Sequence, residues 1–234
     1  MEFNDFKNIL MGEFPGVTPG QLSLFEKMDA LYREWNAKIN VISRKDIDNL
    51  YEHHVLHSLG IALYLKYQRP DVFASWGGEA LLSEAATAPE LQTVSVLDLG
   101  CGGGFPGIPL AVLFPGVHFT LCDSIGKKIT VAKEVASALG LENVEAVNAR
   151  AESLPGPYDY VVSRAVTSLD NFLPWVKGKY RNSVLYLKGG DLAEEISQAM
   201  GRCGLPKGSV SLWPISSVLK DEFFDGKMVI EVKK

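Results

Sequence analysis

A glycine-rich loop that follows a short aliphatic run is the feature that most restricts how this chain can fold. Residues 94–99 read Val-Ser-Val-Leu-Asp-Leu, which is typical of a buried strand, and a glycine cluster fills 100–107. Pro106 and Pro109 suit the first turn of a helix, which the apolar run 110–114 would continue. Strand, glycine loop and helix in this order open the nucleotide site of α/β sheets, because the helix N-terminus offers unpaired N–H groups and a positive dipole end.

The motif inside this loop favours S-adenosylmethionine over a dinucleotide as the ligand. Residues 102–107 match G-x-G-x-x-G, the dinucleotide pattern, which is weak evidence in isolation. Asp98, however, lies inside the strand end, where a carboxylate can hold the ammonium group of a zwitterion but sits badly beside a pyrophosphate. Residues 98–104 also form D-x-G-x-G-x-G, like motif I of class I methyltransferases. We therefore expect Gly100 and Gly102 to approach S-adenosylmethionine. The alternatives are an NAD-dependent oxidoreductase and a tight turn that binds nothing.

Composition limits the classes of protein that the chain can form. It has 234 residues, 47% hydrophobic and 22% charged, with a net charge of −5. These values are ordinary for a globular protein, and the acidic balance means that any RNA binding must depend on a local basic patch. The cysteines lack metal-ligand spacing, the N-terminal stretch lacks a signal sequence, and no apolar run reaches membrane-spanning length. We expect a cytoplasmic protein with reduced thiols, no metal and no membrane partner.

Three segments follow one another along the chain. Residues 1–66 are predicted to form a helical extension, with one amphipathic helix starting at the Thr-Pro-Gly-Gln of 18–21 and a second from about Asp46. Residues 67–93 are rich in Gly, Pro and Ala and are predicted to be a linker with an insertion that could hold one small helix. Residues 94–234 are predicted to form the α/β domain, so that the chain is one compact unit overall.

Short apolar strands alternate with helices from residue 94 onward. We predict strands at about 94–99, 117–122, 144–147, 158–163 and 183–187, and helices at about 127–139, 169–176 and 192–200. Two last strands, at about 210–213 and 228–232, have no helix between them and are expected to be antiparallel. The pattern predicts a Rossmann-like, mostly parallel seven-stranded sheet with an antiparallel last pair, the class I S-adenosylmethionine-dependent methyltransferase fold.

The candidate donor contacts follow the predicted strands, since ligands of such sheets bind outside the carboxyl ends. Asp123 ends the second strand about twenty residues after the glycine loop, where a carboxylate meets a ribose diol. Its alternative role is a helix N-cap. Phe105 could pack on the donor from within the loop. Ala151 and Glu152 follow the third strand, where an adenine ring usually lies, although Glu152 could instead be a solvated charge.

The end of the fourth strand indicates the chemistry of the acceptor. Residues 163–166 read Ser-Arg-Ala-Val instead of the Asp/Asn-Pro-Pro-Tyr/Phe expected of an exocyclic-amine methyltransferase. Cys101 on the donor loop and Cys122 inside a strand are poorly placed as nucleophiles for pyrimidine C5 chemistry. Arg164 can bridge a phosphate or a guanine edge, its alternative being a salt bridge. An acceptor with a free lone pair, such as a purine ring nitrogen, needs no general base, only alignment.

Basic residues recur at predicted strand ends and loops and could form a basic rim for RNA, with solvated surface lysines as the alternative. They are Arg44, Lys45, Lys127, Lys128, Arg164 and Lys188. His53, His54 and His57 invite a zinc interpretation, but no further ligand lies near them in the sequence. Packing or phosphate contact is the favoured role, with His54 as the candidate RNA contact.

Several short motifs between about residues 20 and 190 match one known family. They are Trp35-Asn36, Asn40-Val-Ile-Ser-Arg44, His54 with Ser58, Asp98-Leu-Gly100, Phe105-Pro-Gly-Ile-Pro-Leu110, Asp123-Ser-Ile-Gly-Lys-Lys128, Ser163-Arg-Ala165 and Leu187-Lys-Gly189. On these motifs the chain resembles the bacterial small-subunit rRNA guanine-N7 methyltransferases of the glucose-inhibited division B group. Phe-Pro-Gly-Ile-Pro and Ser-Arg-Ala are the more specific motifs. Where the family usually has Arg-His before an Asp-Ser pair, this chain has His53-His54 and His57-Ser58.

The resemblance implies methyl transfer from S-adenosylmethionine to guanine N7 in 16S rRNA, either as RNA or within the 30S subunit. N7 carries a free lone pair, which agrees with the missing base and the missing Pro-Pro motif. The donor contacts that the resemblance implies are Gly100, Phe105, Asp123, Ala151, Glu152 and Arg164. We expect a monomer. A non-catalytic RNA-binding assembly factor that retains the fold is the remaining alternative.

Overall fold

The aliphatic runs of the carboxyl-terminal part pair into one sheet. The computed structural model describes residues 1–83 and 94–234. The strands are β1 (Ser95–Leu99), β2 (His118–Asp123), β3 (Val144–Asn148), β4 (Tyr158–Arg164), β5 (Tyr180–Gly189), β6 (Val210–Pro214) and β7 (Lys227–Lys233). Their order is β3-β2-β1-β4-β5-β7-β6; the first five are parallel, and β7 runs antiparallel to both neighbours. The predicted seven-stranded sheet with an antiparallel last pair is therefore confirmed.

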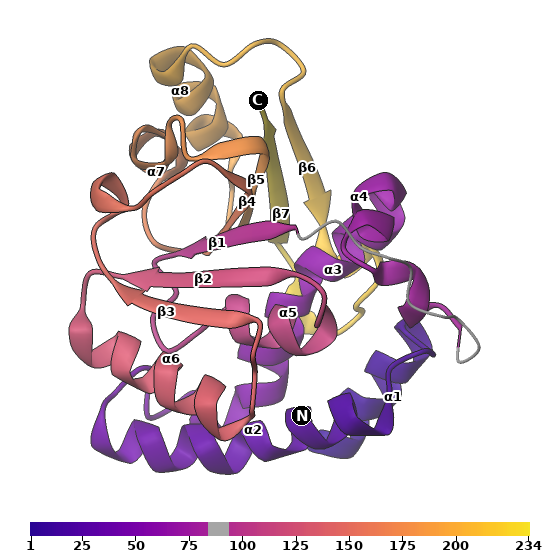
Figure 1. The fold of residues 1–234 in the computed structure, drawn as a ribbon. Coiled ribbons are helices and arrows are strands. Elements are labelled where there is room, and N and C mark those ends of the chain that lie inside the picture. Colours follow the sequence, from indigo (N-terminus) through magenta and orange to yellow (C-terminus); the bar gives the residue numbers. More distant parts are fainter. Residues whose placement is uncertain (84–93) are drawn as a thin grey trace.

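Helices cover both faces of this sheet (Figure 1). They are α1 (Phe3–Glu13), α2 (Pro19–Lys38), α3 (His57–Gln68), α4 (Pro70–Ser75), α5 (Gly107–Leu113), α6 (Gly126–Ala138), α7 (Leu169–Val176) and α8 (Ala193–Cys203). Single turns lie at Ile47–Asn49, Leu50–Leu56, Gly78–Leu81, Ala151–Ser153, Ile215–Ser217 and Glu222–Phe224; the second of these is π-helical and the others are 3-10 helices. The predicted helical N-terminal extension and the crossover helices are present within one or two residues of the expected limits at most ends.

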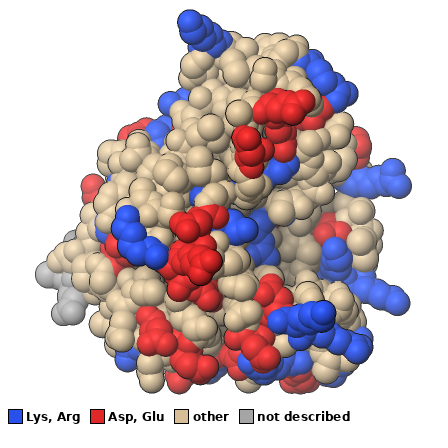
Figure 2. Space-filling view, turned by 180° about the vertical axis from the view of Figure 1, so that it is seen from behind, with Lys and Arg blue, Asp and Glu red and all other residues tan. Residues whose placement is uncertain are grey.

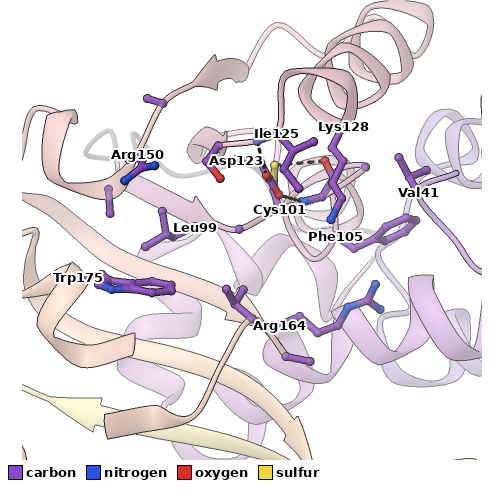
Figure 3. Close-up of a pocket in the computed structure, with 18 of the residues that line it drawn as sticks. Val41, Leu99, Cys101, Phe105, Asp123, Ile125, Lys128, Arg150, Arg164 and Trp175 are labelled. Atoms are coloured by element: carbon purple, nitrogen blue, oxygen red, sulfur yellow. Dashed lines mark hydrogen bonds between the residues drawn. The ribbon is translucent and has the colours of Figure 1, made fainter. Parts of the chain in front are cut away.

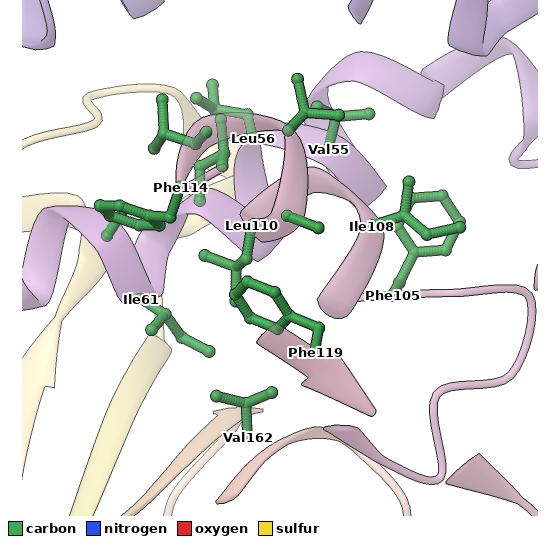
Figure 4. Packing of buried hydrophobic residues seen from close by; sticks show 14 of the residues in the cluster. Val55, Leu56, Ile61, Phe105, Ile108, Leu110, Phe114, Phe119 and Val162 are labelled. Atoms are coloured by element: carbon green, nitrogen blue, oxygen red, sulfur yellow. The ribbon is translucent and has the colours of Figure 1, made fainter. Parts of the chain in front are cut away.

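The N-terminal segment and the sheet share one apolar core. Every residue from 57 to 65 in α3 is buried, so this helix is enclosed instead of presenting one amphipathic face. Figure 4 shows the packing of α5 and its neighbours through Val55, Leu56, Ile61, Phe105, Ile108, Leu110, Phe114, Phe119 and Val162. A second cluster on the opposite face packs α7 and α8 through residues such as Phe172 and Ala199. The N-terminal helices are therefore part of the main core.

Local signals explain where α2 begins. Thr18 and Gln21 form a capping box, in which the Thr18 hydroxyl accepts from the Gln21 N–H and the Gln21 amide oxygen accepts from the Thr18 N–H. Pro19 occupies the first helical position, where its missing N–H has no cost. The start predicted from Thr-Pro-Gly-Gln is confirmed. The helix continues to Lys38.

The described part of residues 67–93 is packed against the core. Trp76 is 1% exposed, and its ring centroid lies 5.3 Å from that of Phe114 and 5.5 Å from that of Tyr160. The small helix expected in this segment is α4. Residues 84–93 of the predicted insertion lie outside the described residues. Within the described ranges, no helix is both long and apolar enough to cross a membrane.

The second predicted helix departs from regular α geometry. A 3-10 turn at Ile47–Asn49 is followed by a π-helical turn at Leu50–Leu56, and only then by α3. A π turn widens the helix and shifts the side chains that follow it relative to a 3.6-residue period. His53 and His54 both lie in this turn, and both rings reach the carboxylate of Asp46. A regular helical period does not predict this convergence.

Candidate functional site

A cavity of about 610 Å³ lies at the carboxyl ends of β1, β2 and β4 (Figure 3). This is the edge at which parallel sheets bind ligands, and the volume suits a small organic molecule. The predicted donor contacts Gly100, Gly102, Phe105, Asp123, Ala151, Glu152 and Arg164 all line it. Val41 and Ile125, which the family motifs contain without an assigned role, also line it, as do Arg150 and Trp175, for which no role was predicted. Trp175 comes from α7 and is 39% exposed, and no local motif marks it.

The glycine loop needs glycine for two separate reasons. Gly100 has φ +75°, and a Cβ there would lie 2.4 Å from Val166 Cγ2. Gly107 begins α5, and its Cβ would lie 2.2 Å from Leu121 Cδ2 and 2.7 Å from the Asp98 carboxylate. A side chain at Gly107 would push the loop off β1 and β2, and one at Gly100 would collide with the turn after β4. The two glycines therefore let the loop lie close to the strand ends, where Gly100, Gly102 and Gly103 line the cavity.

Asp98 supports the loop from behind. It is fully buried and does not line the cavity, and its Oδ2 accepts a 2.7 Å hydrogen bond from the Gly107 N–H. Its Oδ1 has no hydrogen-bond partner among the described residues. Burial raises the pKa of Asp98 to about 8, so the group is largely a neutral acid at pH 7. This placement differs from the expected ammonium contact, because the side chain points to the α5 face of the sheet.

Asp123, the last residue of β2, lines the cavity. Its Oδ2 accepts from the Gly102 N–H at 3.0 Å, and its Oδ1 accepts from the Ile125 N–H at 2.8 Å. The N-cap position of α6 is Ile125, so Asp123 is not its capping residue. Each carboxylate oxygen can accept a second hydrogen bond. Asp123 is therefore fixed in orientation while keeping acceptor capacity for a ligand diol.

The turn after β4 carries an unusual backbone. Ala165 has φ +48°, the one non-glycine residue with positive φ in the described chain. The Tyr186 hydroxyl holds the next two residues, accepting from the N–H groups of Val166 and Thr167 and donating to the Thr167 carbonyl at 2.8 Å. This turn lines the cavity beside Arg164. Strained backbone at the end of a strand is a recurrent feature of binding sites.

Arg164 closes the cavity on the side of Phe105 and Val41, away from Arg150 (Figure 3). Its Nη1 donates to the His53 carbonyl at 3.1 Å, its Nη2 contacts His54 Nδ1 at 3.0 Å, and the guanidinium carbon lies 5.1 Å from the Phe105 ring centroid. Burial lowers the pKa of Arg164 to about 10, which leaves it charged at pH 7. No ion pair between residues in the described ranges includes it, so the alternative of a sheet-edge salt bridge is wrong.

The N-terminal segment supplies one wall of the cavity. Asn36 is 8% exposed; its amide oxygen accepts from the N–H groups of Val41 and Ile42 at 2.8 and 2.9 Å, and its amide nitrogen donates to the Ile42 carbonyl. These bonds hold Val41 against the glycine loop, where a Cβ on Gly103 would meet its Cγ2 at 2.8 Å. The motif that starts at Trp35-Asn36 thus has a structural role in shaping the site.

The cysteines near the site are buried thiols. Burial raises the pKa of Cys101 well above its usual value and that of Cys122 to about 11. A thiol in this state is a poor nucleophile at neutral pH. Across residues 1–83 and 94–234, no group of three His, Cys, Asp or Glu side chains is arranged to hold a metal ion.

The candidate RNA contacts differ in how accessible they are. Arg44, Lys45 and Lys127 are exposed, and Lys128 lines the cavity. Lys188, in contrast, is paired with Glu195 and bonded to the Thr167 carbonyl. His54 is 12% exposed in its side chain, and both ring nitrogens are used within the protein. Figure 2 shows basic and acidic groups interspersed on the rear face, with several basic side chains projecting at its right-hand edge.

Comparisons with known proteins agree on one family. A family model described as rRNA small subunit methyltransferase G matches residues 80–218. Proteins named ribosomal RNA small subunit methyltransferase G are similar over nearly the whole chain. That of Flavobacterium johnsoniae is 44% identical over 227 residues, 94% of each chain, and that of Flavobacterium psychrophilum is 46% identical over 231 residues, 95% of this chain and 96% of the other.

A solved structure supports the fold assignment. The magnesium protoporphyrin IX methyltransferase of Synechocystis PCC 6803 with bound SAH superposes with a TM-score of 0.50 at 15% sequence identity, covering 75% of this chain and 84% of that chain. At this identity the match speaks for a shared architecture alone.

Proposed function

The chain belongs to the rRNA small subunit methyltransferase G family, and we propose that it transfers a methyl group from S-adenosylmethionine to N7 of a guanine in 16S rRNA. The observation that carries this proposal is the nearly full-length similarity to relatives whose name specifies small-subunit rRNA methylation. We further propose that it acts in the cytoplasm as a monomer, on 16S rRNA or on the 30S subunit.

The strand order supports S-adenosylmethionine as the donor. Ala151 and Glu152 follow β3, Asp123 ends β2, the glycine loop follows β1, and Arg164 ends β4. These strands are consecutive in the sheet, so the candidate contacts span three strand spacings, or about 14 Å. An elongated ligand would have its adenine beside Ala151, its ribose at Asp123, its sulfonium over the glycine loop and its amino-acid end toward Arg164.

The side chains near β4 support an acceptor that needs no deprotonation. The Ser163 hydroxyl is fully buried and donates to the Leu99 carbonyl at 2.7 Å, so it is not available as a base. Arg164 is charged, and the buried thiols of Cys101 and Cys122 are protonated. Guanine N7 has a free lone pair, and its methylation requires only that sulfonium and nucleophile be held in line.

Of the candidate RNA contacts, Arg44, Lys127 and Lys128 best fit that role in this geometry. Arg44 and Lys127 are exposed, and Lys128 lies at the cavity. Phosphate contacts from such residues would make binding to RNA strongly salt-dependent. Lys188 and His54 are engaged within the protein, so we propose an internal structural role for both.

The test is titration with S-adenosylmethionine and S-adenosylhomocysteine, followed by transfer of labelled methyl to 16S rRNA and to 30S subunits. Label recovered as 7-methylguanosine would support the donor, the reaction and the position together. Label on another base would overturn the N7 assignment, and donor binding without turnover on either substrate would favour a non-catalytic assembly factor. Binding of NADH in preference to both sulfur ligands would favour an oxidoreductase.

A further inference from the structure

Arg164 is a half-buried cation that pairs directly with no carboxylate of the described residues; Asp46, the nearest ionised one, is separated from it by the His54 ring. Its hydrogen-bond partners are a backbone carbonyl and an imidazole, and Asp98, the carboxyl group that acts on its charge most strongly, is itself largely protonated at pH 7. A buried charge without an opposite charge is costly unless a ligand supplies one. Only two of its N–H groups are used within the described residues, which leaves the others for a ligand in the cavity.

His54 orients this cation without cancelling its charge. Its Nδ1 lies 3.0 Å from Arg164 Nη2, and its Nε2 lies 2.7 Å from Asp46 Oδ2. Since Arg164 can only donate, Nδ1 must be the acceptor, and the ring proton is assigned to Nε2. Burial and the nearby guanidinium lower the pKa of His54 to about 4, so the ring is neutral at pH 7. A neutral acceptor holds Arg164 while its full charge remains available.

Asp46 fixes the ring from the other side. Its two carboxylate oxygens contact His54 Nε2 and His53 Nδ1, and the backbone carbonyl of His53 is the second acceptor for Arg164. Burial alone would raise the pKa of Asp46, but the hydrogen bonds from both histidines outweigh it and the pKa is lowered. Asp46 thus fixes His53 and His54, and these two residues hold the Arg164 guanidinium.

We propose that Asp46 and His54 are positioning residues that act through Arg164, holding its guanidinium so that it binds the carboxylate at the amino-acid end of the methyl donor. This rests on the proposed function, because it takes S-adenosylmethionine as the ligand. The donor carboxylate is the favoured anion because Arg164 lies against Phe105 of the glycine loop and away from Arg150, the neighbour in sequence of the proposed adenine contact Ala151 (Figure 3).

Two ligands separate this role from a general structural one. S-adenosylhomocysteine carries the amino-acid carboxylate, whereas 5′-methylthioadenosine has the same nucleoside and thioether without it. Calorimetric titration of His54→Leu should show about tenfold weaker binding of S-adenosylhomocysteine and unchanged binding of 5′-methylthioadenosine. Asp46→Asn should also weaken the binding of S-adenosylhomocysteine and leave that of 5′-methylthioadenosine unchanged. His54→Asn, whose amide oxygen can replace the Nδ1 acceptor, should restore most of the affinity.

Matched controls come from the same chain. His118, 42% exposed at the start of β2, provides His118→Leu, and Asp48, 78% exposed and paired with Arg33, provides Asp48→Asn. Neither should change the affinity for either ligand. In an Arg164→Ala background, His54→Leu should cause no further loss, because residues that act through one group are not additive. If His54→Leu does not fold, Asp46→Asn and His54→Asn carry the same comparison.

The outcomes are distinct. Equal weakening of both ligands, full additivity with Arg164→Ala, or unchanged affinity in His54→Leu and Asp46→Asn would overturn the positioning role while the wild-type chain still binds the donor product. A wild-type chain that binds neither ligand would overturn the proposed function, and this inference with it.

Discussion

At the scale of single residues, the carboxylate of Asp123 offers the most direct test of the donor site. It already anchors the glycine loop and the turn before α6, and it keeps acceptor capacity toward the cavity. Asp123→Ala should weaken S-adenosylhomocysteine binding by about tenfold or more, because a ribose contact and two loop anchors are lost together. Calorimetry measures the effect, with Glu145→Ala on the neighbouring strand, 64% exposed, as the control. Unchanged affinity would remove the ribose role.

Asp98 should give the fold a characteristic pH dependence. Its pKa is about 8 in the folded chain, against an ordinary value of 3.8. Its contribution to the free energy of unfolding is therefore fully present below pH 3.8 and is lost as the pH rises through 8. His54 and His57 have the opposite sign. Their folded pKa values lie below the ordinary 6.5, so their contribution to the free energy of unfolding is present above pH 6.5 and is lost as the pH falls below it, for His54 through about 4.

Between pH 6.5 and 8, therefore, the Asp98 effect is not opposed by these histidines. The free energy of unfolding of the wild type should fall across this window, by up to about 1.4 kcal/mol per pH unit. Asp98→Asn should flatten the decline, since an amide keeps the acceptor for Gly107 and does not ionise. Urea denaturation at several pH values measures both curves. Parallel curves would show that Asp98 is already ionised in the folded chain.

At the scale of elements, the turn after β4 depends on one hydroxyl from β5. Tyr186→Phe leaves the N–H groups of Val166 and Thr167 without their acceptor. We expect the free energy of unfolding to fall by about 2–3 kcal/mol. We also expect the rate of methyl transfer to fall in the fraction that remains folded, because the turn carries Ala165 next to Arg164. Chemical denaturation and a transfer assay measure the two effects. Tyr180→Phe, at the other end of β5, should leave transfer at the wild-type rate.

The sequence predicted the elements of the sheet well, because each strand is a short aliphatic run bounded by turn residues. The start of α2 was equally predictable, since Thr18 and Gln21 form a local capping signal. The π-helical turn at Leu50–Leu56 could not be predicted, because widened helices have no distinct hydrophobic period. The packing of Trp76 was also missed, because a loop-like composition says nothing about long-range contacts.

The site was predictable to the extent that it lies at strand ends. Asp123 ends β2, Ala151 follows β3 and Arg164 ends β4; these parallel strands lie within one group of four neighbours, β3-β2-β1-β4, so topology alone brings their carboxyl ends to one cavity. Trp175 reaches that cavity from α7, and no local signal indicates it; Val41 reaches it from the loop after α2, where its motif gave no sign of contact with the site. The direction of the Asp98 side chain was likewise decided by tertiary packing.

At the scale of the whole molecule, the N-terminal helices are required for the fold. α3 is buried along residues 57–65, and the main core cluster runs from Phe6 to Val229. A chain that begins at residue 67 should therefore expose one face of the sheet and lose cooperative unfolding. Thermal melting followed by far-ultraviolet circular dichroism measures this. A sharp transition at the wild-type temperature would show that residues 67–234 fold independently.

The position of β7 has a consequence for the biosynthesis of this chain. β7 lies between β5 and β6, and its buried Glu231 accepts a 2.8 Å hydrogen bond from Tyr64 of α3, 167 positions earlier, and pairs with Arg69. During translation, α3 emerges long before this partner is made. The nascent chain must therefore keep an apolar helix and an unfinished sheet edge unpaired until β7 leaves the ribosome, and that interval is when it would most need a chaperone.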